Sequence, residues 1–221
     1  MPSAYAALLI GALVCLARPS TLADFPKAAD ELYRGQMSDA LSDAAAQREI
    51  LEAKAQASWT AEDFEPYLMA ATSAIEMALV LFDLRHGALP GHLDVLRESK
   101  IIEDWPGNPF EDWKPMAQLS GGVDFEPGAI VFQKCPQGRS YGARHPVVEC
   151  FVLSAFGPTP RYKPLGKLPP LPEWAEAPKG TAAVGVFQPP TMTEILRKLA
   201  ERKQREKDTE RSKPQGGGRE G

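Results

Sequence analysis

The sequence has few of the residues from which most enzymes and metal sites are built. Only three histidines occur in 221 residues, and none of them stands in the H-E-x-x-H or Cys-His spacing that gathers zinc ligands. No Walker sequence, dinucleotide fingerprint or Gly-x-Ser-x-Gly elbow is present. We therefore expect no catalytic residue, no cofactor and no metal, and the chain is not predicted to be an enzyme.

The chain also lacks a long hydrophobic run near its start. Residues 5–17 form an apolar run of about thirteen, which is too short for a ~30 Å bilayer but has the length of a signal-peptide core. Thr21 and Ala23 supply small residues for a signal peptidase. Residues 1–23 are therefore predicted to be a cleaved signal peptide, and the protein to be periplasmic or extracellular. If the segment is retained, it would act as a membrane anchor.

Positive charge is scarce except at the end of the chain. The net charge of −4 gives no basic footprint, so nucleic acid is not an expected partner. Residues 193–221 carry nine Lys or Arg against six acids, which leaves about −7 on the remainder. We expect residues 191–221 to form a charged tail, helical to about residue 211 with Thr193 as its cap and disordered from 216. The tail is either solvated or docks on phospholipid or an acidic partner.

Cysteine is also rare. Signal cleavage would remove Cys15 and leave Cys135 and Cys150, which we expect to form a disulfide because an exported protein meets an oxidising compartment. Closing such a loop is worth ~3 kcal/mol in the chain-entropy model. The alternative is a pair of reduced, half-buried thiols.

Hydrophobic periodicity predicts two helical regions. Residues 24–60 form a lead-in of one long helix or two shorter ones broken near Gly35. Thr60 and Asp63 have the pattern of a helix start, and apolar residues then recur at steps of three and four to residue 86. Gly87 suits a left-handed residue after the last turn, and Pro90 prevents continuation.

The residues after this helix are predicted to form a short helix, a turn, two strands and an extended segment. Residues 93–102 have the composition of a short helix, 105–109 of a turn, and 128–134 and 147–154 of strands, and Ser154 is expected to cap a strand end. Residues 159–190 are rich in proline and predicted to be extended. The predicted fold is α+β, with a head of residues 61–158 in which a long helix packs on a small antiparallel sheet.

Two groups of side chains leave alternatives open. Trp105, Phe110, Trp113 and Phe125 are expected to close the core, although they could form a recognition surface. The acids of the head could bind Ca²⁺ or perform acid–base chemistry. These acids are Asp83, Glu103, Asp104, Glu111, Asp112 and Asp124.

Three motifs follow one another in residues 75–158: an apolar helix with a Gly-x-x-Pro exit, a Trp-Pro-Gly-Asn-Pro-Phe turn, and a strand ending in Ser-Ala-Phe-Gly-Pro. In this order they resemble the globular heads of type IV pilins and type II secretion pseudopilins, the major pseudopilin in particular. The residues that carry the resemblance are Gly87, Pro90, Trp105, Gly107, Asn108, Pro109, Ser154, Gly157 and Pro158. The family binds calcium after its last strand, but Thr159, Pro160 and Arg161 replace the expected Asp-Gly, so no calcium is predicted.

The resemblance implies a protein that has a structural or docking role in a bacterial envelope assembly, with other proteins of a secretion or pilus system as partners. The chain departs from the family because it has no basic leader and no hydrophobic stem, so we do not expect it to polymerise in the usual way. Two alternatives are a periplasmic or secreted enzyme or ligand-binding protein with an unrecognised site, and an adaptor that binds its partner through the tail.

Overall fold

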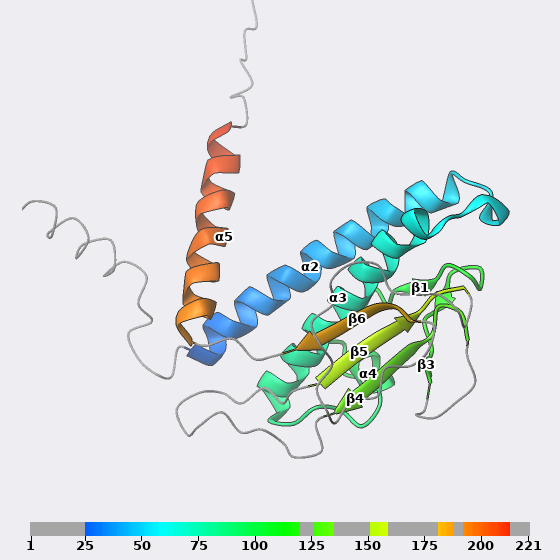
Figure 1. Ribbon diagram of the computed structural model, residues 1–221. Helices are drawn as coiled ribbons and strands as arrows, with labels where there is room; N and C mark the ends of the chain where they lie inside the picture. Colours follow the sequence, from blue (N-terminus) through cyan, green and yellow to red (C-terminus); the bar gives the residue numbers. More distant parts are fainter. Residues whose placement is uncertain (1–24, 120–125, 135–150, 159–180, 188–191, 213–221) are drawn as a thin grey trace, which may run out of the picture. The chain divides into compact units, whose positions relative to one another are not determined.

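A computed structural model describes residues 25–119, 126–134, 151–158, 181–187 and 192–212 (Figure 1). The chain divides into two compact units, residues 33–189 and residues 1–32 with 190–221. The predicted signal peptide, Cys135, Cys150, Phe125 and the glycine-rich end lie outside the described residues.

The larger unit is α+β, as predicted. Its elements are most of α2 (Phe25–Glu52), η2 (Gln56–Ser58), α3 (Ala61–His86), α4 (Asp94–Glu98), β1 (Gly107–Asn108), β2 (Lys114–Pro115), β3 (Gln118–Leu119), β4 (Ile130–Lys134), β5 (Phe151–Phe156) and β6 (Thr181–Phe187). β1 pairs with β2, and the other strands form a sheet in the order β3-β4-β5-β6. That sheet is mixed, because β3 and β4 are parallel while the remaining pairs are antiparallel.

The ends of α3 are the predicted ones. The Thr60 backbone N–H donates to Asp63 Oδ2 at 2.8 Å, and the Asp63 N–H donates to the Thr60 carbonyl at 3.1 Å. At the other end Gly87 adopts φ +74° and donates its N–H to the Asp83 carbonyl at 2.7 Å. The Asp63 carboxylate also accepts a hydrogen bond from the Lys54 ammonium. This bond is the largest cause, and the bonds from Thr60 the next, of a pKa of Asp63 that is lowered to about 2.

α3 packs against β5 and β6, side by side with α2 (Figure 1). Among the described residues it is the helix long and apolar enough to cross a membrane, yet 61% of its apolar 18-residue window is buried within the protein. Its core residues Leu68, Ala71, Ile75 and Leu79 are fully buried. All six residues of β5 are buried, so both faces of this central strand are covered.

Of the two arrangements left open for the lead-in, the single long helix is confirmed, because α2 runs unbroken through Gly35. Two other features differ from the sequence expectations. Ser154 is not at a strand end but inside β5, opposite Val131 and Val184. β6 lies in the proline-rich stretch that was set apart from the head, so the sheet extends beyond the predicted boundary at residue 158. The predicted short helix is confirmed as α4, with Leu96 fully buried.

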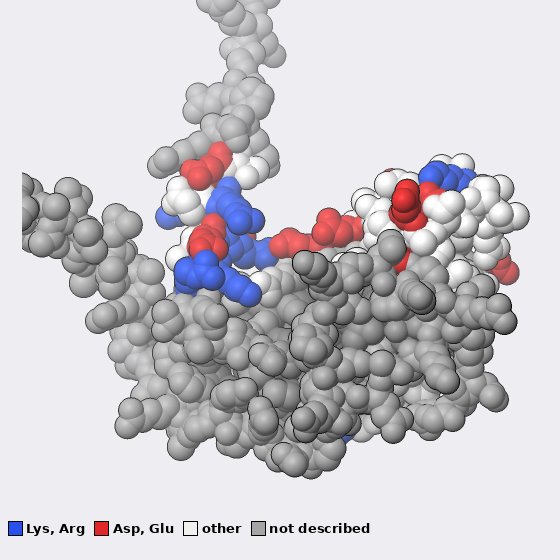
Figure 2. Space-filling view, viewed as in Figure 1, with Lys and Arg blue, Asp and Glu red and all other residues white. Residues whose placement is uncertain are grey.

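The smaller unit contains the start of α2 and helix α5 (Met192–Ser212). α5 begins at Met192, so Thr193 lies within the helix and is not its cap. Cations and anions are interleaved along α5 (Figure 2), with ion pairs Arg197–Glu201 at 2.7 Å and Arg202–Glu206 at 3.1 Å. Within this unit, Lys203 also lies 3.2 Å from Glu31. Exposed pairs of this kind contribute little stability each.

Candidate functional site

The turn at residues 105–109 is organised around one buried amide. Asn108 is 2% exposed. Its Nδ2 donates to the Pro127 carbonyl at 2.8 Å, and its Oδ1 accepts the Phe110 backbone N–H at 2.9 Å. The Asn108 carbonyl accepts the N–H of Trp113 at 3.0 Å. One side chain therefore fixes the turn and joins it to the segment that precedes β4.

Two glycines make room for this arrangement, each for a different reason. A Cβ at Gly107 would lie 2.7 Å from the Trp113 carbonyl oxygen, so Gly107 is needed for close approach rather than for the positive φ suggested by its place in a turn. Gly128 has φ +75°, and its Cβ would lie 1.8 Å from Asn108 Oδ1. The Asn108 side chain therefore packs directly against the backbone of Gly128, where a larger residue has no room.

The turn is attached to the first part of α3. The Tyr67 hydroxyl donates to the Gly107 carbonyl at 2.6 Å, and the Tyr67 ring meets Trp113 edge-on at 5.0 Å between centroids. Phe64 and Phe110 make a similar contact at 5.5 Å. Burial raises the pKa of Tyr67 to about 12, while the Gly107 bond and the nearby Arg48 charge act in the opposite direction.

Trp105 ties the other side of the turn to the strands. Its Nε1 donates to the Met116 carbonyl at 3.0 Å, and the Met116 N–H donates to the Pro106 carbonyl at 3.0 Å. Trp105, Phe110 and Trp113 are only partly buried, so they close the edge of the core rather than its centre.

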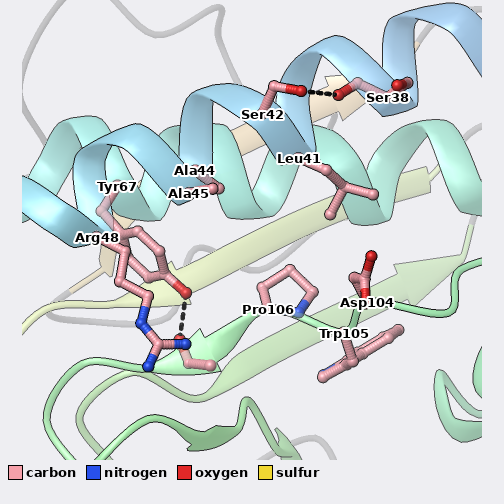
Figure 3. Close-up of a pocket in the computed structure, with 11 residues that line it drawn as sticks. Ser38, Leu41, Ser42, Ala44, Ala45, Arg48, Tyr67, Asp104, Trp105 and Pro106 are labelled. Carbon is pink, nitrogen blue, oxygen red and sulfur yellow. Dashed lines mark hydrogen bonds between the residues drawn. The ribbon is translucent and has the colours of Figure 1, made fainter.

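A pocket of about 410 Å³ opens between α2, Tyr67 of α3 and this turn (Figure 3). Its lining residues are Ser38, Leu41, Ser42, Ala44, Ala45, Arg48, Tyr67, Asp104, Trp105, Pro106 and Gly107. Small and apolar side chains of α2 form much of one wall, and the turn forms the opposite wall. Arg48 and Asp104 are the two charged residues of the lining.

Arg48 is held by two contacts. Its Nε donates to Glu52 Oε1 at 2.7 Å, and its guanidinium carbon lies 4.6 Å from the centroid of the Trp113 ring. Trp113 and Asp112 have φ values of 60° and 48°, which are unusual for residues other than glycine. The backbone thus adopts a costly conformation where it places the ring under Arg48.

A separate line of polar residues runs along α3. Glu65, Thr72 and Glu76 are seven and four residues apart, a spacing that aligns them on one side of a helix. Burial raises the pKa of both Glu65 and Glu76 to about 7. Glu65 Oε1 and Thr72 Oγ1 have no hydrogen-bond partner among the described residues. The described residues also contain no group of three or more His, Cys, Asp or Glu suited to a metal ion.

The structure brings only part of the predicted motif together. Trp105, Gly107, Asn108 and Pro109 form one turn. The other motif positions belong to other places in the fold: Gly87 and Pro90 follow α3, Ser154 lies within β5, and Gly157 and Pro158 follow β5.

Sequence reasoning missed Arg48, Tyr67 and Gly128. Tyr67 stood in the predicted helix and Gly128 at a predicted strand start, but no short-range pattern joined either residue to Asn108. Arg48 lies in a lead-in helix whose position on the head could not be predicted. No protein-family model, curated protein or solved structure matches this chain.

Proposed function

We propose that this chain is a non-enzymatic, exported, pilin-like protein that serves as a structural or docking component of a bacterial envelope assembly, of the type II secretion or type IV pilus kind. The observation that supports it best is the Asn108 turn. It lies between α3 and the antiparallel strands and fastens both, through Tyr67 on one side and Pro127 on the other. The motif residues of the turn thus hold α3 and the strands together, as expected for a protein whose head serves as a rigid structural or docking part.

The helix and strands in this order also agree with a pilin-like head. α3 ends at a left-handed Gly87 before Pro90, and the turn then leads to β4 and β5. Gly157 and Pro158 directly follow the central strand. These features support the fold part of the proposal, and the role in an assembly needs a cellular test.

Site-specific photo-crosslinking in the producing bacterium provides that test. Met69 on α3 is 58% exposed, whereas the adjacent Leu68 is fully buried. A photoreactive residue at Met69, or at the exposed Ile50, is expected to capture an envelope secretion or pilus component, and one at Leu68 is expected to capture none. Protein that stays in the cytoplasm and crosslinks only to cytoplasmic partners would refute the proposal.

The pocket favours a second candidate, a ligand-binding protein. The substitution Arg48→Gln, which removes a charge from the pocket, distinguishes the two candidate functions. An assembly component would keep its crosslinks in this variant. A protein that acts only by binding a ligand in the pocket would lose both the ligand and its cellular function.

A further inference from the structure

The pocket beside the Asn108 turn has the size and composition of a binding site. Its volume of about 410 Å³ falls within the range of ~300–1,000 Å³ found for small-ligand sites. Every residue that lines it belongs to the larger unit. The turn forming one wall is rigid, because Asn108 and Tyr67 hold it with bonds of 2.6 to 2.9 Å.

Arg48 forms a prepared cationic end. Glu52 engages Nε, and a guanidinium has five N–H donors, so the four on the two terminal nitrogens can face another acceptor. The contact with the Trp113 ring restricts the guanidinium, which lowers the entropy lost when it binds a carboxylate. Figure 3 shows the Arg48 guanidinium beside the Tyr67 hydroxyl, at the pocket wall.

Asp104 forms the opposite end. Figure 3 shows its carboxylate on the far side of Pro106 from Arg48, with Leu41 above it in the view. Asp104 is exposed and makes no ion pair with any described residue. A cation and an anion thus bracket a short apolar stretch, and Ser38 adds a hydroxyl that can bond an amide.

We propose that this pocket binds a short dipolar peptide segment, with a carboxylate on Arg48, an ammonium or guanidinium on Asp104, and small apolar side chains between them against Leu41 and Ala44. The inference goes beyond the structural role proposed above and does not depend on it, because binding is a property of the pocket residues themselves. A small pocket with charges at both ends suits a few residues of extended peptide better than a helix or a large apolar ligand.

The test uses the whole protein and synthetic tetrapeptides capped at both ends. The probes are Glu-Ala-Ala-Lys and its reverse, Lys-Ala-Ala-Glu, with matched peptides in which Gln replaces either the Glu or the Lys. Binding is followed by Trp fluorescence and by nuclear magnetic resonance shifts of the indole N–H groups. We expect saturable binding of at least one dipolar probe, weakened about threefold to tenfold by either replacement and by added salt.

Protein variants assign the two ends. Arg48→Gln should abolish the preference for Glu over Gln in the peptide, and Asp104→Asn the preference for Lys over Gln. The matched control is Arg97→Gln, because Arg97 also lies over a tryptophan, at 5.9 Å from the Trp105 centroid, but does not line the pocket. It should leave both preferences unchanged.

Three results would overturn the inference: no saturable response to either dipolar probe, equal binding of the charged and neutral peptides, or the same loss with Arg97→Gln as with Arg48→Gln. Thermal unfolding of each variant identifies any that fails to fold. If Arg48→Gln is unstable, Arg48→Lys keeps the charge but loses the planar fork, and should weaken binding while it retains the preference for Glu.

Discussion

Replacement of Gly128 by alanine should be far more harmful than the loss of one glycine in a loop suggests. The left-handed φ of +75° costs a Cβ-bearing residue ~1–2 kcal/mol. The new Cβ would lie 1.8 Å from Asn108 Oδ1, so the amide must move away. That movement breaks its bonds to Pro127 and Phe110, and each buried group left without a partner costs ~1–3 kcal/mol. The expected destabilisation is therefore at least about 3 kcal/mol.

Two other glycines separate the contributions. Gly91 has no positive φ and nothing within 4 Å of a new Cβ, so Gly91→Ala should change stability by less than about 0.5 kcal/mol. Gly87 has φ +74° and also open space, so Gly87→Ala should cost only the backbone strain of ~1–2 kcal/mol. The three variants form a series of no strain, strain alone, and strain with a steric clash.

A double-mutant cycle with Asn108→Ala isolates the clash. The shorter side chain removes the atom that the new Cβ would strike, so Gly128→Ala should cost only ~1–2 kcal/mol in that background. Urea unfolding followed by Trp fluorescence measures each variant. The reasoning is refuted if the two substitutions are additive within about 0.5 kcal/mol, or if Gly128→Ala costs no more than Gly87→Ala.

Three further predictions concern single side chains. Tyr67→Phe removes the 2.6 Å bond to the Gly107 carbonyl and should lower the free energy of unfolding by about 1–2 kcal/mol in urea titrations; an unchanged midpoint would contradict the attachment of the turn to α3. Burial raises the pKa of Glu76 from 4.5 to about 7, so its ionisation destabilises the fold as pH rises through this window, and Glu76→Gln should gain about 1–3 kcal/mol at pH 8 relative to pH 4. A gain that does not vary with pH would exclude this cause. The pKa of Asp63 is lowered to about 2, so its stabilising bonds should persist above pH 3.8 and be lost as pH falls toward 2. Thermal unfolding of Asp63→Asn should accordingly differ from the parent at neutral pH and converge with it in strong acid.

Local signals in the sequence were sufficient for the helices and the class of fold. α3 has the predicted bounds because a Thr-Asp cap, an apolar periodicity and a glycine exit all act within a few residues of its ends. The turn at Asn108 was predicted from composition, since Pro, Gly and Asn favour turns wherever they occur. Those signals do not show what the turn contacts.

The parts that could not be predicted depend on contacts between distant residues. β6 was missed because its neighbours in sequence are proline-rich, and it becomes a strand by pairing with β5. The pocket was missed because Arg48 and Asp104 come from segments whose packing no local pattern determines. Composition placed Gly107 in the turn but did not show why glycine is needed there, which is the close approach of the Trp113 carbonyl.

The pairing of β6 with β5 has a practical consequence for where the chain can be cut or lengthened. A truncation after residue 158 would turn β5, now buried on both faces, into an edge strand with unpaired backbone groups, and such a fragment should aggregate. An insertion between β5 and β6, unlike this truncation, keeps both strands and should cost little stability. Closure entropy of a flexible loop grows only with the logarithm of its length, so a flexible insert that doubles the length of chain between β5 and β6 should cost only about 0.6 kcal/mol and leave their pairing intact.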